Sequence, residues 1–130
     1  MRELLYARTK LAPDTGALLP EEEWQTLDEH LYKTALLTKK NAQAFGAEGL
    51  GHAAGMLHDL GKASDDFQRR LKGSNDPVDH KSAGAIEAYR RYGKFLGKVL
   101  AYVIFGHHGG LPDDVSDDRS RGLSDVLKNK

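Results

Sequence analysis

The chain has 130 residues, and its 19 Lys and Arg residues balance its 19 Asp and Glu residues, so the formal net charge is zero. This length fits one domain around one modest core, and the charge balance does not indicate a strongly basic nucleic-acid binder, although local basic patches could still bind DNA. The absence of cysteine excludes thiolate catalysis, disulfides and cysteine-ligated zinc or iron–sulfur clusters. Any transition-metal site must therefore use His, Asp or Glu side chains.

The sequence contains no segment typical of membrane insertion. Its longest apolar run, Val99 to Phe105, is much shorter than the roughly 20 residues of a membrane-spanning helix. The N-terminus also lacks the apolar segment of a secretory signal peptide. We therefore expect a soluble cytoplasmic protein without a membrane partner.

Residues 1–23 come first in the chain, and their prolines and glycine indicate an irregular or extended lead-in. The first helix is predicted from Thr26, which heads a capping box with Glu29 three residues on. A glycine, Gly46 or Gly49, is expected to end this region. Its inward face is predicted from helical spacing to consist of Leu27, Leu31, Thr34, Ala35 and Thr38.

A second helix is predicted over residues 47–60, with Gly61 as its C-terminal stop. Its buried stripe is expected to be Leu50, Ala53, Ala54 and Leu57. A third helix starts after the N-cap Ser64, because two aspartates follow in the favourable first turn. Phe67 and Leu71 should face inward, and residues 73–77 form a loop by composition.

A fourth helix is predicted over residues 79–92, with His80 near its start, and a fifth over residues 94–105. The buried stripe of the fifth helix is predicted to be Leu96, Val99, Leu100 and Val103. The acidic segment 113–118 indicates a loop, and residues 123–127 can start a last helix. No segment alternates clearly enough to predict a sheet, and no internal repeat or second domain is visible. The predicted class is therefore all-α.

Five of the six histidines of this sequence occur at four separate stations: His30, the dipeptide His58-Asp59, His80, and the pair His107-His108. All but His80 lie in or at the end of an apolar helical stripe, so imidazoles from separate helices can point toward one centre. A single histidine that points inward is more often a core residue with its hydrogen bonds made than a metal ligand. We interpret His52, which has no motif around it, in this way. Imidazole and carboxylate suit divalent transition metals, and the ordered joint occurrence of the stations favours a metal site.

Several segments carry a family resemblance. Residues 58–62 read HDLGK, which resembles the signature of HD-superfamily phosphohydrolases. The segments that narrow the resemblance are Trp24 to Leu31, ASDDFQRRL over 63–71, His80-Lys81 followed by Gly84-Ala85, and GHHGGL over 106–111. Together they resemble the HD nuclease domain of the CRISPR-associated type I helicase-nuclease, over about Trp24 to Asp113.

The resemblance implies an HD-superfamily helical bundle with up to two divalent ions: manganese, iron, cobalt or nickel, with magnesium or zinc as alternatives. One ion would take His30, His58 and Asp59, and the other would take Asp59, His80, His107 and His108. A carboxylate has two oxygens and can span two cations, so Asp59 would bridge the ions and act in catalysis. Lys62 would supply positive charge to the scissile phosphate, unless it is a solvated lysine near a helix C-terminus.

The implied activity is that of a metal-dependent phosphodiesterase that cuts single-stranded DNA in type I CRISPR interference. The implied partners are a helicase domain or subunit and the RNA-guided surveillance complex. Basic clusters at 39–40, 69–72, 90–98 and 119–121 could contact phosphates or be solvated helix faces, and Tyr89 and Tyr92 could stack bases or pack in the core. Two alternatives stay open: an HD phosphohydrolase acting on nucleotides, and a truncated, inactive HD module that binds partners.

The sequence departs from the family pattern near its C-terminal end. The family carries a further metal-binding aspartate on a later helix, well beyond the paired histidines. Asp125 is the one late candidate in a helical setting, but it follows His108 too closely, and Asp113, Asp114, Asp117 and Asp118 look like loop acids. We therefore expect residues 1–130 to be a single HD domain truncated at its C-terminus, with one metal ion or none bound and poor nuclease activity.

Overall fold

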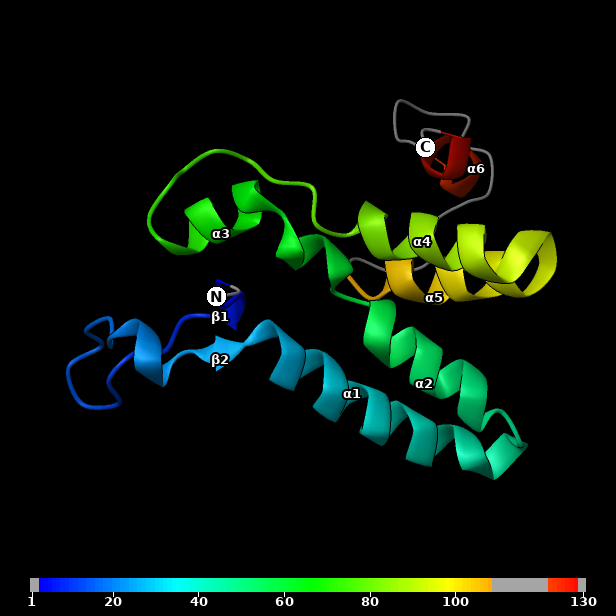
Figure 1. Cartoon of the computed structure of the whole chain (residues 1–130), viewed down its shortest axis with the longest axis horizontal. Helices are drawn as coiled ribbons and strands as arrows, with labels where there is room; N and C mark the ends of the chain where they lie inside the picture. The colour runs from blue at the N-terminus through cyan, green and yellow to red at the C-terminus, as the bar shows by residue number, and fades with distance from the viewer. Residues whose placement is uncertain (1–2, 109–121, 129–130) are drawn as a thin grey trace.

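The structure is a computed structural model that describes residues 3–108 and 122–128. In these residues the longer elements are β1 (Tyr6–Arg8), β2 (Gln25–Thr26), α1 (Leu27–Ala42), α2 (Glu48–Leu57), α3 (Asp65–Leu71), α4 (Ser82–Tyr92), α5 (Lys98–Gly106) and α6 (Leu123–Lys128) (Figure 1). Short 3-10 turns are η1 (Glu21–Glu23), η2 (Gln43–Phe45) and η3 (Leu60–Ala63), and a π-helical turn is η4 (Gly93–Gly97). Helices dominate the described residues, which confirms the predicted all-α class.

Helices α1 and α2 form an antiparallel hairpin (Figure 1). The Thr26 hydroxyl accepts the backbone N–H of Glu29 at 3.3 Å, so the predicted N-cap of α1 is confirmed. Gly46 takes the left-handed conformation, with φ of 72°, and turns the chain toward α2. A side chain at Gly55 would collide with the backbone of Ala35, so the two helices pack in close contact. The hairpin places the first turns of α1 beside the C-terminal end of α2.

The largest hydrophobic cluster lies among α2, α4, α5 and α6. Its buried members are Ala53, Ala85, Ala88, Leu100, Ala101, Ile104, Leu123 and Leu127. The predicted stripe of α2 contributes to this cluster, and the predicted last helix is confirmed as α6. None of the helices in the described segments has both the length and the apolar character that a membrane crossing requires.

The predicted buried stripe of the fifth helix is confirmed at Leu100 but wrong at its other three positions, where Leu96 is 43% exposed. Val99 and Val103 are 47% and 51% exposed, whereas Leu100, Ala101 and Ile104 are buried. Residues 99–105 are apolar almost all round, so their periodicity does not select a face. The π-helical turn η4 precedes α5 and changes the rotation of the residues that follow, which a regular helical period does not anticipate.

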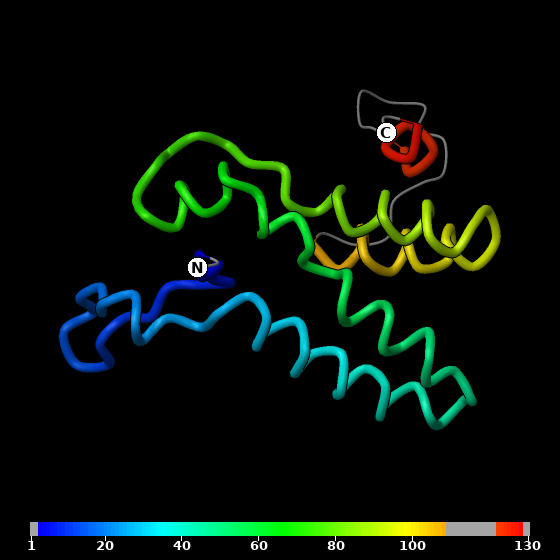
Figure 2. The backbone as a smooth tube through the Cα atoms, in the orientation of Figure 1, coloured from blue at the N-terminus to red at the C-terminus, as the bar shows by residue number. Residues whose placement is uncertain are grey.

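The lead-in contains a small sheet that the sequence did not predict. Strands β1 and β2 pair antiparallel, with Tyr6 opposite Thr26, and the rings of Tyr6 and Trp24 meet edge to face at 5.5 Å. Strands of three and two residues are too short to produce a visible alternation. In the backbone trace, β1 runs between the start of α1 and the segment that leads to α3 (Figure 2).

Two of the predicted helix boundaries that were wrong affect site residues. Helix α2 ends at Leu57 rather than near residue 60, and Gly61 is buried in η3 instead of acting as a C-terminal stop. Helix α4 begins at Ser82, because the Asp79 carboxylate accepts the backbone N–H groups of Lys81 and Ser82. His80 therefore precedes the helix that it was predicted to open.

Candidate metal centre

The Asp59 carboxylate lies at the centre of the histidine stations. Its side chain is 6% exposed, and its Oδ2 lies 2.9 Å from the Nε2 of His30 and 3.2 Å from the Nε2 of His58. The two imidazole Nε2 atoms are themselves 3.2 Å apart. His30 comes from α1 and His58 directly follows α2, so the antiparallel hairpin brings these side chains together. One carboxylate oxygen and two imidazole nitrogens thus form a compact group.

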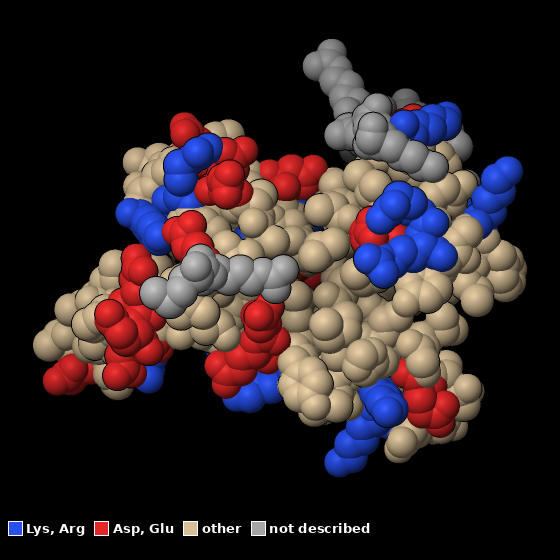
Figure 3. Space-filling view, viewed as in Figure 1, with Lys and Arg blue, Asp and Glu red and all other residues tan. Residues whose placement is uncertain are grey.

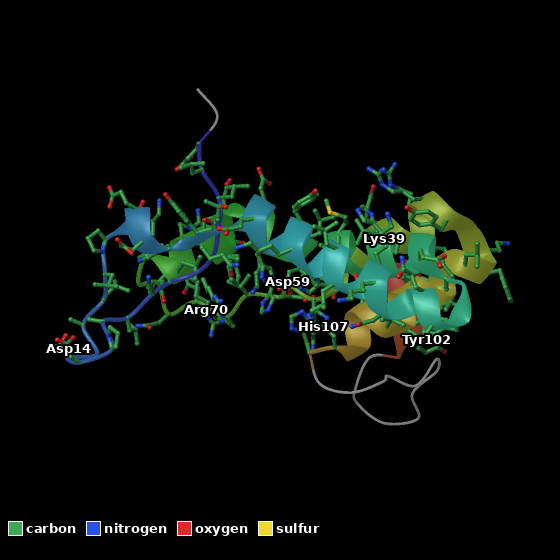
Figure 4. The ribbon with its side chains drawn as sticks, turned by 90° about the horizontal axis from the view of Figure 1, so that it is seen from below. Asp14, Lys39, Asp59, Arg70, Tyr102 and His107 are labelled. Carbon is green, nitrogen blue, oxygen red and sulfur yellow. The ribbon has the colours of Figure 1, made fainter. Side chains whose placement is uncertain are left out.

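The second oxygen of Asp59 faces the paired histidines at the end of α5. Oδ1 lies 3.3 Å from the Nε2 of His107 and 3.4 Å from the Nε2 of His108. Asp59 and His107 lie close together near the middle of the molecule in Figure 4. In each of the two sets, the potential ligand atoms all lie within 4.8 Å of one another. A single carboxylate therefore presents one oxygen to each of two histidine pairs.

Backbone carbonyls fix the orientation of two of these imidazoles. The Nδ1–H of His58 donates to the carbonyl oxygen of Gly55 at 2.6 Å, and the Nδ1–H of His107 donates to that of Ile104 at 2.5 Å. Because a carbonyl only accepts, each neutral ring must carry its proton on Nδ1 and keep the Nε2 lone pair free. Metal-binding histidines are commonly held by such contacts. Both rings therefore direct a potential ligand atom toward Asp59.

The surroundings of Asp59 keep its carboxyl group ionised. Burial alone would raise its pKa, but the hydrogen bond and charge of His58, together with the charge of Lys62, hold the pKa well below its usual range. Burial alone would lower the pKa of His58, but its hydrogen bonds to Asp59 and Gly55 outweigh this effect, so the pKa of His58 is raised. Asp59 and His58 thus each favour the charged form of the other.

Two other imidazoles of the cluster favour the neutral form. Burial, with the neighbouring charges of His107 and His80, lowers the pKa of His108 to about 4. Burial also lowers the pKa of His30, and the hydrogen bond to Asp59 opposes this effect only in part. Neutral imidazole and ionised carboxylate are the forms that bind a metal ion.

The cluster contains polar atoms that an added cation would satisfy. Oδ1 of Asp59 and Nε2 of His108 are buried and make no hydrogen bond within the part of the chain that the structure describes. Leaving a buried polar atom unpaired costs about 1–3 kcal/mol. A divalent cation can accept a lone pair from each atom, and imidazole with carboxylate is a donor set that transition metals prefer. The residues present therefore fit a metal ion.

Comparison with known protein families agrees with this geometry. The chain matches the family model described as Cas3, HD domain, over residues 15–130. The chain belongs to the Cas3 HD-domain family. No curated protein matches it. Membership in the Cas3 HD family makes the chain a metal-dependent hydrolase of the nuclease and phosphohydrolase class, and the two His/Asp sets fit this assignment.

The side chain of Lys62 contacts the cluster. Its Nζ lies 3.1 Å from Oδ2 of Asp59, and the side chain is only 17% exposed. The ammonium group also lies 5.6 Å from the centre of the Phe67 ring. The alternative of a solvated lysine is therefore wrong, whereas a contact of Lys62 with phosphate stays a prediction.

His80 lies at the edge of the cluster rather than inside it. Its ring meets that of His108 edge to face at 4.7 Å and lies 5.1 Å from the ring of Phe67. Among the described residues, the two sets that could hold a metal ion do not include His80. Its role as a ligand in this Cas3 HD domain stays a prediction.

His52 and Asp125, which the sequence analysis also considered, lie outside the cluster. His52 lines a separate hollow on α2 that also includes Met56 and Tyr92. Asp125 is exposed on α6 and belongs to neither metal-binding set of the described residues. Asp113, Asp114, Asp117 and Asp118 lie outside the described residues.

Sequence reasoning missed two residues that shape the site of this Cas3 HD domain. A side chain on Gly61 would collide with the backbone of His80, so this glycine allows η3 to approach the histidine. Gln68 was recognised only as part of a family segment, but its buried amide bonds to the backbone of Lys62. A glutamine beside Phe67 in a short helix with four charged residues was a weak signal of that role.

Proposed function

We propose that this chain is a metal-dependent phosphodiesterase that cuts single-stranded DNA during type I CRISPR interference in the cytoplasm. Its partners would be a helicase domain or subunit and an RNA-guided surveillance complex. The observation that carries the proposal is the Asp59 carboxylate, whose two oxygens face separate histidine pairs. A shared carboxylate of this kind suits two-metal hydrolysis of a phosphodiester.

The proposed roles follow from the contacts of each residue. Asp59 would bind both ions, His30 and His58 would complete one set, and His107 and His108 would complete the other, with His80 beside them. Bound divalent ions supply hydroxide at neutral pH and stabilise negative charge on the phosphate. The Gly55 and Ile104 carbonyls keep the rings of His58 and His107 aimed at the centre.

Lys62 is proposed to bind the phosphate of the substrate. Its ammonium group is held at 3.1 Å from Oδ2 of Asp59, so it lies beside the atoms that would bind the metal. A fixed positive charge there would attract the anionic phosphate without moving during the reaction. His107 is 33% exposed at the outer edge of the cluster, which gives a polymer access from the surface.

Contacts of the substrate outside the centre are more restricted than the basic clusters suggest. Arg69 forms an ion pair with Asp66, and Arg90 and Arg91 both form ion pairs with Glu87. On the face seen in Figure 3, acidic and basic side chains occur in mixed groups rather than as one basic surface. We therefore propose that the metal centre and a small number of phosphate contacts, rather than a large basic surface, hold the strand.

The test is a side-by-side assay with manganese, iron, cobalt, nickel, magnesium and zinc. Circular single-stranded DNA, duplex DNA and nucleoside triphosphates are each incubated with the wild-type chain and with Asp59→Asn. We expect a transition metal to support nicking of the circular strand only in the wild type, with duplex DNA resistant. Hydrolysis of nucleotides with DNA left intact would contradict the proposed substrate and favour the nucleotide phosphohydrolase.

A further inference from the structure

The side-chain amide of Gln68 makes three hydrogen bonds to the backbone. Its Oε1 accepts the N–H of Tyr6 at 3.0 Å, and its Nε2 donates to the carbonyl oxygens of Tyr6 and Lys62, both at 2.8 Å. The residue is 9% exposed. Both hydrogens of the amide and its oxygen are therefore used, in an environment where an unpaired group would be costly.

This amide extends the small sheet toward η3. Tyr6 lies in β1, which pairs with β2 while its own N–H and carbonyl bond to Gln68. A primary amide carries a donor and an acceptor side by side, as a peptide group does. Gln68 therefore takes the place that a neighbouring strand would occupy, and it joins β1 to the turn that carries Lys62.

The connection reaches the metal centre from two directions. Strand β2 ends at Thr26, the N-cap of α1, and His30 lies one turn into that helix. On the other side, the backbone of Lys62 is held by Gln68 while its Nζ lies 3.1 Å from Asp59. One buried amide thus links the segment that starts α1 to the segment that carries the cation of the site.

The neighbour of Gln68 in the sequence supports the same arrangement. The Phe67 ring lies 5.1 Å from the His80 ring and 5.6 Å from the Nζ of Lys62. Ser64 caps α3 by accepting the N–H of Phe67, which fixes the start of this helix. Helix α3 therefore contacts the side chain of Lys62 through Phe67 and its backbone through Gln68.

We propose that Gln68 is a positioning residue for Lys62. It holds η3 against β1, and this contact keeps the Lys62 ammonium group beside Asp59 rather than in solvent. Gln68 acts through Lys62, since its three side-chain hydrogen bonds go to the backbone of Tyr6 and Lys62. The inference deepens the proposed function, on which its catalytic consequence rests, while the structural connection can be tested without metal or substrate.

Two substitutions separate the contacts. Gln68→Met keeps the length and bulk of the side chain and removes all three hydrogen bonds. Gln68→Glu keeps an acceptor for the Tyr6 N–H, but it places a carboxylate oxygen against the carbonyls of Tyr6 and Lys62. The matched control is Leu127→Ala, which weakens the buried cluster of α4, α5 and α6 away from this network.

Hydrogen exchange of the metal-free proteins provides the first readout. We expect both Gln68 variants to exchange faster over residues 60–64 and to keep the wild-type rate over α5. Leu127→Ala should show the reverse pattern. If Gln68→Met does not fold, Gln68→Glu carries the test, because it retains one contact to β1. Wild-type exchange over 60–64 in a folded Gln68 variant would overturn the proposal.

A double-mutant cycle with Lys62→Met provides the second readout. Cleavage of circular single-stranded DNA should lose about 10- to 100-fold in kcat on Gln68→Met when Lys62 is present, because misplaced charge weakens catalysis. The same substitution should cost less than about twofold in the Lys62→Met background, since the two residues act as one unit. Equal losses in both backgrounds would show a merely structural role for Gln68. If the wild type cuts no DNA, the proposed function fails, and the exchange result alone decides the connection.

Discussion

Substitution of Gly61 by alanine is expected to separate η3 from the segment that carries His80. The added Cβ would lie 2.6 Å from the carbonyl carbon and 2.7 Å from the Cα of His80, and it would also collide with the carbonyl oxygen. These are backbone atoms, which cannot rotate away as a flexible side chain does. Overpacking typically costs about 1–3 kcal/mol, and a backbone collision belongs near the upper limit.

The expected loss of about 3 kcal/mol in the free energy of unfolding corresponds to a fall in Tm of about 10 °C for a domain of this size. Thermal unfolding of the metal-free proteins by circular dichroism measures this change. The control is Gly49→Ala in α2, where an added Cβ meets nothing within 4 Å. Alanine should stabilise that helix by at most about 0.5 kcal/mol, because Gly49 lies in its first turn rather than in its middle. The close packing of η3 on His80 is refuted if Gly61→Ala melts within about 2 °C of the wild type.

Three further predictions concern the metal centre. Asp59→Asn keeps the shape of the one carboxylate in the described cluster but removes its charge, and its Mn²⁺ affinity should fall by more than about 100-fold, because mutation of residues that only hydrogen-bond to a metal ligand already lowers affinity by about 10–100-fold. The control His52→Ala should bind Mn²⁺ as the wild type does, and equal affinities for Asp59→Asn and wild type would contradict the site. The metal-free chain should lose stability as the pH falls from 6.5 to 5, because the pKa of His108 is lowered to about 4 in the folded state and the unfolded state therefore binds more protons there. In melting experiments at several pH values His108→Asn should lose less stability, and an unchanged slope of stability against pH would exclude this contribution. Calorimetric titration with Mn²⁺ should reveal one tightly bound ion or none, because His30 and His58 share Asp59, their one described carboxylate, with His107 and His108. Two tightly bound ions of similar affinity would mean that a further residue completes the set of His30 and His58.

The sequence predicted the parts of the fold that depend on local signals. Thr26 and Ser64 are helix N-caps, as their side-chain chemistry indicates, and each accepts a backbone N–H in the structure. Three of the four histidine stations also meet around Asp59, and His30 and His58 do so because they lie at adjacent ends of an antiparallel hairpin. Short-range caps and a family signature were sufficient for these features.

The features that the sequence did not predict depend on contacts between distant segments. Residues 99–105 are apolar almost all round, so only packing against neighbouring helices such as α4 and α6 determines which face is buried. Gly61 was interpreted as a helix stop, although the reason for a glycine there is the backbone of His80 in another segment. The amide of Gln68 pairs with Tyr6, 62 residues away, and no local pattern marks such a pair.

Single-turnover cleavage of circular single-stranded DNA, followed against Mn²⁺ concentration, tests the central role of Asp59 most directly. Wild-type protein should nick the circle in a metal-dependent way and stop when the ion is chelated. Asp59→Asn should be slower by at least about 10³-fold at saturating metal, because the variant lacks the charge that both proposed metal sets share. Cleavage by Asp59→Asn at close to the wild-type rate, or wild-type cleavage that persists after chelation, would contradict the account.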